Sequence, residues 1–304
     1  MEERIVKSLC PLPANSRLVI FGGGFSGQHV AKIARQLGAK VFCSRRTSKK
    51  DGADFIFNSI TNELPEFNVL RNATHVLSCI PPSANGNDPV LTHFTKELRD
   101  APLQWVGYLS TTGVYGDSQG KWVNEEDEVN PKQPRSIRRL ACEEEWRKSN
   151  LPIQILRLPG IYGPGRSAIE TISSGKAKMI EKPGQVFSRV HIDDIAGAAL
   201  FLMNLARKGI HPKIVNIADD LPCSNLEVLS FAAKLIGKSL PPVQSFEKAS
   251  KEMSPMAISF WEENRRIENK LLCENLGYSL IHSDYRSGLL GCLQNRSIKV
   301  NTIN

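Results

Sequence analysis

The chain has 304 residues, of which 41% are hydrophobic and 23% are charged, and its formal net charge is +8. This composition excludes a disordered or fibrous chain, and no apolar run reaches the roughly 20 residues that a membrane-spanning helix needs. The seven cysteines contain no CxxC pair and the six histidines no HExxH motif, which predicts reduced thiols and no metal site.

The ends and the charges of the chain also limit its partners. The first residues contain no apolar stretch typical of a secretory signal, so we expect a cytoplasmic protein without a membrane partner. Lysine and arginine form no dense stripe interleaved with aromatic residues, which disfavours a nucleic-acid partner. The positive charge instead favours small anionic ligands, phosphates included.

Short apolar runs alternate with helical stretches along the chain. Rich in Val, Ile and Phe, these runs resemble strands buried on both faces: Arg17–Phe21, Lys40–Cys43, Asp54–Phe57, His75–Cys79, Gln104–Leu109, Ile153–Leu158 and Lys213–Ile217. We expect helices at Gln28–Leu37, Ser136–Lys148, Asp193–Ala206, Asn225–Ile236 and Asn264–Asn275. The alternation predicts an α/β fold with a doubly wound parallel sheet of about seven strands.

The pattern of elements changes after about residue 160, where loops rich in Gly and Pro separate the expected helices. We expect a Rossmann domain over residues 16–165 and a smaller substrate-binding lobe over residues 166–304. A strand near residues 213–217 is expected to return to the main sheet, so the two parts interleave.

The stretch "FGGGFSG" follows the first expected strand and precedes the first expected helix. Its Gly22, Gly24 and Gly27 fit the GxGxxG pattern, which permits a tight turn, close approach of a pyrophosphate and close packing of helix on strand. Phe25 and Ser26 stand at the helix start, where free N–H groups attract phosphate. A plain glycine-rich turn is the alternative, and the strand–loop–helix order favours a dinucleotide site.

The end of the second strand indicates which dinucleotide binds. An NAD site usually has an acidic residue there for the ribose 2′-hydroxyl. This chain has Ser44, Arg45 and Arg46, and no carboxylate follows until Asp51. These side chains can hold a 2′-phosphate, so we expect NADP(H) rather than NAD(H). Two solvated surface arginines are the alternative.

The fourth strand ends in "SCIPP". Strand ends on this side of a doubly wound sheet line the ligand crevice. We therefore expect Cys79, Ile80 and Pro81 to pass beneath the cofactor.

Several motifs occur in a fixed order: "GGGFSG", "LSTTGVYGD", "ILRLPGIYGPGR", "RVHIDDIAGAAL" and "VNIADD". Together they resemble the extended short-chain dehydrogenase/reductase family, the epimerase and dehydratase group, over roughly residues 16–290. The resemblance implies a seven-stranded Rossmann sheet with a small C-terminal substrate lobe, a nicotinamide cofactor, and a homodimer as one expected assembly.

The family's chemistry uses a Ser or Thr, a Tyr that acts as general acid and base, and a Lys four residues after that Tyr. The resemblance assigns the hydroxyl to Thr111, with Ser110 and Thr112 beside it. Aligning Arg139 with the family's Lys places Arg135 where the Tyr should be, and no tyrosine occurs between Tyr115 and Tyr162. The pattern therefore resembles the atypical subgroup, which keeps the glycine loop and loses the catalytic set.

The same resemblance implies roles for the arginines. A guanidinium cannot shuttle protons at neutral pH, so Arg139 is expected to hold ribose hydroxyls and Arg135 an anionic substrate. The segments that face the substrate in the family contain Tyr115, Arg157, Tyr162, Arg166 and Arg189 here. Asp88 matches weakly the acidic residue of the atypical subgroup, and a helix cap is an equal alternative.

Three functions are consistent with these patterns. The favoured one is an NADP-dependent oxidoreductase or epimerase that acts on a small anionic or nucleotide-sugar-like substrate. The second is a non-catalytic NADP(H) sensor or partner-binding module, which the missing Tyr and Lys support. Nucleic-acid binding through the basic surface is the least favoured.

Overall fold

A computed structural model describes residues 11–47, 53–65 and 68–301, with side chains described up to residue 294. Residues 1–10, on which the expected absence of a secretory signal rests, lie outside this range, as does Asp51.

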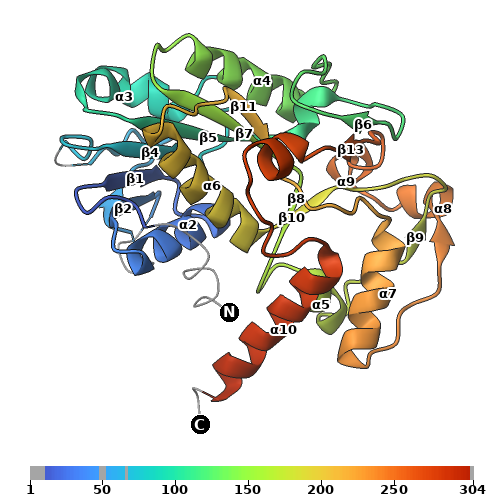
Figure 1. Cartoon of the computed structure of the whole chain (residues 1–304). Coiled ribbons are helices and arrows are strands. Elements are labelled where there is room, and N and C mark those ends of the chain that lie inside the picture. The colour runs from blue at the N-terminus through green and yellow to red at the C-terminus, as the bar shows by residue number, and fades with distance from the viewer. Residues whose placement is uncertain (1–10, 48–52, 66–67, 302–304) are drawn as a thin grey trace.

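The centre of the molecule is a seven-stranded parallel sheet with the order β11-β7-β5-β4-β1-β2-β3 (Figure 1). Its strands are β1 (Arg17–Phe21), β2 (Lys40–Arg45), β3 (Phe55–Ile56), β4 (His75–Ser78), β5 (Trp105–Thr111), β7 (Ile153–Leu158) and β11 (Ile214–Asn216). Each of the seven expected runs supplies one strand. The doubly wound α/β fold predicted from the sequence is therefore confirmed.

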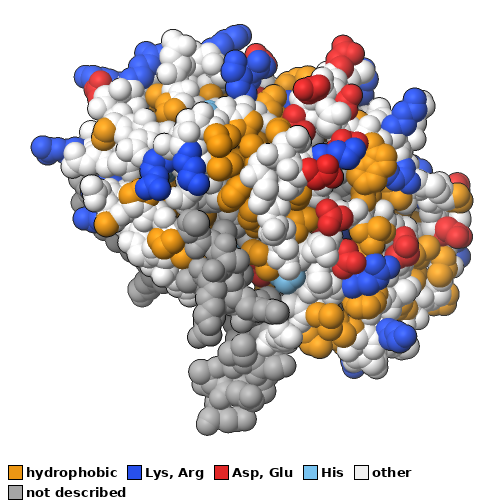
Figure 2. Space-filling view, in the orientation of Figure 1, with side chains coloured by type: hydrophobic (Ala, Val, Ile, Leu, Met, Phe, Trp, Pro, Cys, Tyr) orange, Lys and Arg blue, Asp and Glu red, His pale blue; other side chains and the backbone are white. Residues whose placement is uncertain are grey.

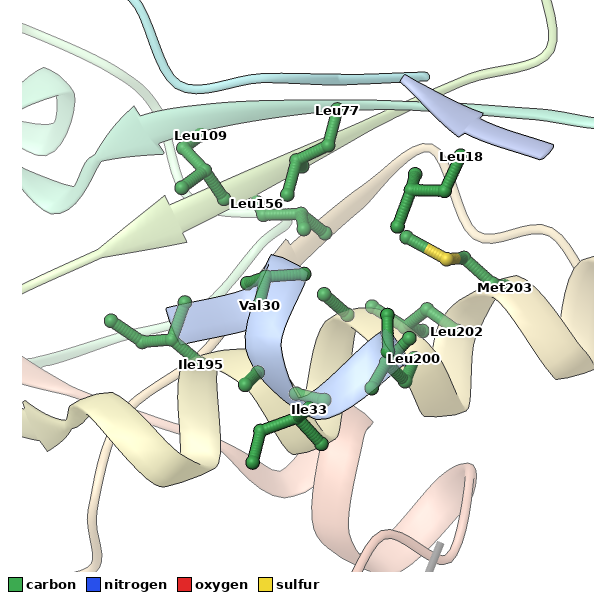
Figure 3. Close-up of a cluster of buried hydrophobic side chains, with 14 of the residues drawn as sticks. Leu18, Val30, Ile33, Leu77, Leu109, Leu156, Ile195, Leu200, Leu202 and Met203 are labelled. Atoms are coloured by element: carbon green, nitrogen blue, oxygen red, sulfur yellow. The ribbon is translucent and has the colours of Figure 1, made fainter. Parts of the chain in front are cut away.

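Helices cover both faces of this sheet, because successive strand side chains point to opposite sides. Leu18 and Ile20 of β1 pack with α2 (Phe25–Gln36) and α6 (Ile192–Arg207), as Figure 3 shows for Leu18. Val19 and Phe21 pack in a second core, with α3 (Pro89–Asp100) and α4 (Pro134–Arg147). Both faces of the sheet are thus buried, as expected for all-parallel strands.

The remaining elements lie at the carboxyl ends of the strands and beyond (Figure 1). Three short parallel pairs occur there: β8 (Gly160–Tyr162) with β10 (Arg189–His191), β9 (Ile180–Glu181) with β12 (Gln244–Ser245), and β6 (Trp122–Val123) with β13 (Arg266–Ile267). The helical pieces are η2 (Thr112–Tyr115), α5 (Ala168–Ser173), α7 (Asn225–Ile236), α8 (Phe246–Ser250), α9 (Pro255–Ser259), η3 (Leu271–Asn275) and α10 (Tyr285–Asn301). A separate apolar core joins α5, α7 and α10.

One expected helix is wrong. Residues 264–275 do not form a continuous helix, because Arg266 and Ile267 pair with Trp122 and Val123 instead. Ile267 is buried in a small core with Val114 and Val123, and only Leu271–Asn275 winds as a short π-helix. Tertiary pairing therefore overrides the local helical pattern of this segment.

The surface in Figure 2 has lysine and arginine side chains scattered over the face shown, with acidic groups among them on one side. Among the described helices, none is both long enough and apolar enough to span a bilayer.

Candidate functional site

The glycine loop connects β1 to α2 and leaves the start of α2 open. The N-cap residue Gly24 has no side chain that could satisfy the first N–H groups of the helix. Because α2 begins at Phe25, earlier than the Gln28 expected, Phe25, Ser26 and Gly27 form its first turn. Their backbone N–H groups are the donors that a helix start offers to a phosphate.

The glycines of the loop have different steric reasons to lack a side chain. Gly22 has a φ of +96°, and a Cβ there would lie 3.0 Å from Ile80 Cγ1. At Gly27 a Cβ would lie 2.2 Å from the Gly22 carbonyl oxygen, so the helix packs directly on the turn. A Cβ at Gly24 would meet no other described atom within 4 Å, which leaves room for a ligand at the helix start. Gly23, which the sequence pattern did not single out, lies against Ser44 and donates its N–H to the Ser44 carbonyl at 2.6 Å.

A cavity of about 1000 Å³ opens in front of this loop. That volume is at the upper end of the range for cofactor sites. Its lining includes all the residues expected to bind the cofactor: Gly22, Gly24, Phe25, Ser26, Gly27, Ser44, Arg45, Arg46, Cys79, Ile80 and Pro81. Arg139 and Arg166 line it as well. Among the described lining residues there is no Asp, no Glu and no Tyr.

The end of β2 forms the rim of the cavity. The Ser44 hydroxyl accepts the Gly22 N–H at 2.9 Å and so holds the loop in place. Arg46 is exposed, whereas the Nε of Arg45 is buried and has no hydrogen-bond partner among the residues that the structure describes. The first described carboxylate after β2, Asp54, accepts from Arg35 at 2.6 Å and from the Cys43 N–H at 2.7 Å. This carboxylate is therefore already engaged outside the cavity lining.

Arg139, on α4, reaches the floor of the cavity. Its Nη1 donates to Tyr108 Oη at 2.9 Å, to the Leu109 carbonyl at 3.1 Å and to the Ile80 carbonyl at 3.3 Å. These contacts join the ends of β4 and β5 and hold the guanidinium beside Ser110, which also lines the cavity.

The two other residues expected to be catalytic lie outside the cavity lining. Thr111 is half-buried, and its hydroxyl accepts the Gly113 N–H at 3.1 Å, so it caps the turn η2. Arg135 donates to Ser259 Oγ, and its guanidinium stacks over the Phe260 ring at 4.3 Å. Neither residue is brought together with Arg139 at the cavity floor.

A second cavity of about 540 Å³ lies among α5, α7 and α10. Its lining includes Tyr162 and four cations, Arg166, Lys176, Lys178 and Arg189, with Glu170 as the one described acidic residue. Arg166 lines both cavities, and its guanidinium lies over the Phe25 ring at 5.6 Å.

Two of the expected substrate residues have structural partners. Arg189 donates to the carbonyls of Phe187 at 2.8 Å and Cys223 at 3.1 Å, and to Asn225 Oδ1 at 2.6 Å. Tyr115 lines neither cavity, because its hydroxyl donates to Asn216 Oδ1 at 2.8 Å in a buried position.

Most of the described sheet lies in a part of the chain that matches a known protein family. Residues 18–218 match the NAD dependent epimerase/dehydratase family. The chain belongs to this family. The match ends just after β11, so it includes residues of all seven strands of the sheet and the floor of the large cavity at β4 and β5, whereas α7 and α10 beside the second cavity lie beyond it.

Several known proteins are similar to this chain in sequence or in structure over most of its length. Protein YeeZ from Escherichia coli K12 is 27% identical over 88% of this chain and 97% of its own length. A conserved protein of unknown function from Silicibacter pomeroyi DSS is 35% identical, with a TM-score of 0.82 over 92% of this chain and 99% of that one. The human epimerase family protein SDR39U1, solved with NADPH, shares the fold at 16% identity and a TM-score of 0.69, covering 92% of this chain and 99% of that one.

This epimerase/dehydratase-family chain has a glycine loop between β1 and α2 and no tyrosine on α4. Asp88, the weak match to the atypical subgroup, caps α3 by accepting the N–H groups of Val90 at 2.8 Å and Leu91 at 3.0 Å. Burial raises the pKa of its carboxyl to about 6. The helix-cap interpretation of Asp88 is therefore the one the contacts support.

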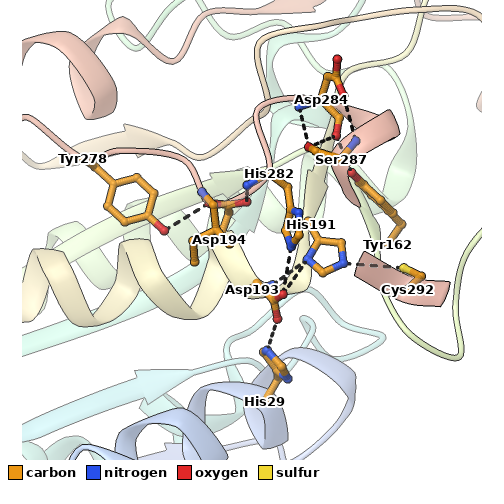
Figure 4. Close-up of polar contacts among 11 residues, drawn as sticks. His29, Tyr162, His191, Asp193, Asp194, Tyr278, His282, Asp284, Ser287 and Cys292 are labelled. Atoms are coloured by element: carbon orange, nitrogen blue, oxygen red, sulfur yellow. Dashed lines mark hydrogen bonds and ion pairs between the residues drawn. The ribbon is translucent and has the colours of Figure 1, made fainter. Parts of the chain in front are cut away.

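A polar cluster that the sequence did not predict joins α2, β10, α6 and the segment around His282 (Figure 4). Asp193, at the start of α6, is within 2.7 Å of His29 Nε2, 3.0 Å of His282 Nε2 and 3.3 Å of His191 Nδ1. The sequence predicted no metal site because its histidines are far apart, whereas the fold brings three of them to one carboxylate.

Proposed function

We propose that this chain binds NADP(H) in the large cavity and acts as an oxidoreductase or epimerase on a small anionic or nucleotide-sugar-like substrate. The observation that carries the proposal is the charge of the cavity. Four arginines line it, Arg45, Arg46, Arg139 and Arg166, and no described acidic residue does. A 2′-phosphate adds charge to the cofactor, and guanidinium groups bind phosphate strongly in such a setting.

The residues present fit the cofactor. The open space at Gly24 and the uncapped start of α2 would hold the pyrophosphate. Arg45 and Arg46 line the rim of the cavity and would hold the 2′-phosphate. The bound nicotinamide supplies hydride transfer in such proteins. The family is described as NAD dependent, SDR39U1 holds NADPH, and other structures of this fold hold NAD, so this preference rests on the arginines of this chain.

The second cavity supports an anionic substrate. Four basic side chains and one described acidic side chain line it, so its lining is positively charged. Tyr162, Val228 and Leu229 contribute apolar surface. Arg166 borders both cavities, so it would contact the substrate and the cofactor together. Ser110 lines the cavity near Arg139, but its hydroxyl donates to the buried Glu143 carboxylate, so Arg139 is the polar group at the floor that we assign to the substrate or the cofactor ribose; Thr111 and Arg135 lie farther out.

Titration of the purified chain with NADPH and with NADH tests the cofactor assignment. Replacing both arginines, Arg45→Ala with Arg46→Ala, should weaken NADPH binding at least tenfold and leave NADH binding within about twofold, because only NADPH carries the 2′-phosphate. The matched control is Arg99→Ala, an exposed arginine at the end of α3 that should change neither affinity. Equal losses for both cofactors in the double variant would overturn the NADP assignment.

A non-catalytic NADP(H) module is the second candidate, favoured by the absence of any tyrosine in the cavity lining described. It predicts tight NADPH binding without oxidation of the cofactor. Following NADPH absorbance with a set of anionic and nucleotide-linked carbonyl compounds distinguishes the two. Turnover that is lost in Arg139→Ala supports the enzyme, whereas tight binding with no turnover across the set supports the module.

A further inference from the structure

We propose that Arg166 couples the two cavities. One edge of its guanidinium contacts the pyrophosphate of the bound cofactor, and another edge contacts an anionic group in the second cavity, so that each ligand strengthens the binding of the other. Among the described lining residues, Arg166 alone belongs to both cavities. The coupling rests on the proposed NADP(H) function, because one of its two ligands is the cofactor.

The turn between β8 and α5 fixes the backbone of Arg166. Gly163 and Arg166 exchange two backbone hydrogen bonds, at 3.0 Å and 2.9 Å, and Gly165 between them has a φ of +84°. Directly after the turn, Ser167 caps α5 by accepting the Ile169 N–H at 3.1 Å. The base of the Arg166 side chain therefore has a defined place, although the residue is exposed.

This turn lies against the first turn of α2. A Cβ at Gly163 would be 3.3 Å from Phe25 Cζ and 2.5 Å from Ile192 Cγ2, so the absence of a side chain there permits the close approach. The Arg166 guanidinium lies over the Phe25 ring, 5.6 Å from its centroid. Phe25 begins α2, whose free N–H groups are the expected pyrophosphate donors. A phosphate bound at this helix start would therefore lie close to the guanidinium.

The donors of the Arg166 guanidinium are available for ligands. Among the residues that the structure describes, this group contacts the Phe25 ring but no carboxylate and no hydrogen-bond acceptor. Arg189, the other arginine of the second cavity, donates instead to the carbonyls of Phe187 and Cys223. A guanidinium has five N–H donors in one plane, so two oxyanions can bind along different edges.

The sizes of two opposing effects decide the sign of the coupling. Ordering a long exposed arginine costs rotamer entropy worth up to about thirtyfold in affinity, and the ligand that binds first meets this cost for both. Repulsion between two anions about 8 Å apart in water at physiological salt amounts to less than about threefold. Ordering outweighs repulsion, so we expect a positive coupling of about fivefold.

Calorimetric titration of the full chain with NADPH, with and without saturating UDP-glucose as the anionic probe, measures the coupling. In the wild type the probe should lower the Kd of NADPH about fivefold, and NADPH should lower the Kd of the probe by the same factor.

The variant Arg166→Gln should weaken NADPH and NADH alike, by about three- to tenfold, because both cofactors carry the pyrophosphate. The probe should then change the Kd of NADPH by less than about 1.5-fold. The equal loss for both cofactors separates Arg166 from Arg45 and Arg46, whose replacement is expected to affect NADPH alone. Far-UV circular dichroism and the melting temperature show whether the variant is folded.

Lys178→Gln is the matched control, because Lys178 is an exposed cation that lines the second cavity and not the large one. It should leave the Kd of NADPH without the probe unchanged and should retain the coupling once the probe is saturating. Loss of the coupling in Lys178→Gln as well would assign it to the general charge of the cavity and overturn the role of Arg166.

Three results in the other arms overturn the coupling and leave NADP(H) binding in place. They are a wild-type Kd of NADPH that the probe does not change, a Kd that the probe raises, and the same coupling in Arg166→Gln as in the wild type. A wild type that binds no NADPH overturns the cofactor assignment together with the coupling.

Discussion

At the scale of single residues, Asp219 shows how much a buried charge depends on its surroundings. Its side chain is 1% exposed, and Oδ2 has no hydrogen-bond partner in the described structure. Burial raises the pKa of this carboxyl to about 8, although Arg189 nearby opposes the shift. A folded-state pKa above the unfolded one means that folding favours the protonated form.

This shift gives a pH dependence with a definite sign. Between the unfolded pKa near 4 and the folded pKa of about 8, the native state binds the proton more tightly, so the contribution of Asp219 to stability is full below pH 4 and is lost as the pH rises to 8. Asp219→Asn keeps the acceptor for the Leu221 N–H and removes the charge. Its melting temperature should exceed that of the wild type by a few degrees at pH 9, and the difference should shrink as the pH falls and vanish near pH 4. A difference that does not change with pH would contradict this account.

Residue patterns that are local in the chain could be predicted from the sequence. The roles of Gly22 and Gly27 follow from a strand, a turn and a helix in sequence, and their steric contacts agree. The hydrogen bond from the Gly22 N–H to the Ser44 hydroxyl and the cluster around Asp193 could not be predicted, because they join residues that only the fold brings together. Histidines separated by many residues give no spacing signal.

At the scale of elements, a buried ion pair fastens α4 to the sheet. Glu143 accepts from Arg157 of β7 at 2.8 Å and 3.2 Å, and their side chains are 1% and 3% exposed. The Ser110 hydroxyl of β5 also donates to Glu143. One carboxylate thus joins α4 to the ends of two strands beside the cavity floor.

Removing this carboxylate should be costly, because it leaves the Arg157 charge buried without its partner. We expect Glu143→Ala to lower the free energy of unfolding by about 3 kcal/mol. Its neighbour Glu144 makes a surface pair with Arg147, in which both side chains are 45% exposed. Glu144→Ala should lower the free energy of unfolding by less than about 0.5 kcal/mol. Unfolding both variants in guanidinium chloride measures the two losses, which come from neighbouring positions on one helix. Equal losses would show that burial is not what makes the Glu143 pair important.

The elements themselves were predictable where periodicity and length agreed. Each buried strand run was short, apolar and followed by a turn, and each became a strand of the sheet. The helix expected over residues 264–275 was wrong because Ile267 pairs with Val123, on a strand far away in the chain. Helix α3 was not among the expected helices. Its start has a local sequence signal, an Asp at the N-cap (Asp88) followed by a Pro at the first helical position (Pro89).

At the scale of the whole molecule, the chain crosses from the sheet to the C-terminal elements and back. After β7 it forms β8, α5, β9 and β10, then α6 returns to cover the sheet, and β11 pairs with β7 at the sheet edge. Ile195, Leu200 and Met203 of α6 belong to the same core as Leu18 and Val30 (Figure 3). The division at residue 165 expected from the sequence therefore cuts through one apolar core.

A fragment of residues 1–165 tests whether that division marks an independent domain. Without α6 and β11, one face of the sheet would expose the apolar side chains that α6 covers, and β7 would become an open edge. We expect this fragment to aggregate or to bind a hydrophobic dye, and to lose the cooperative unfolding and the NADPH binding of the full chain. A fragment ending after residue 218 restores both elements and is expected to recover part of the cooperativity. Cooperative unfolding of the shorter fragment would show instead that residues 16–165 carry a sufficient core of their own.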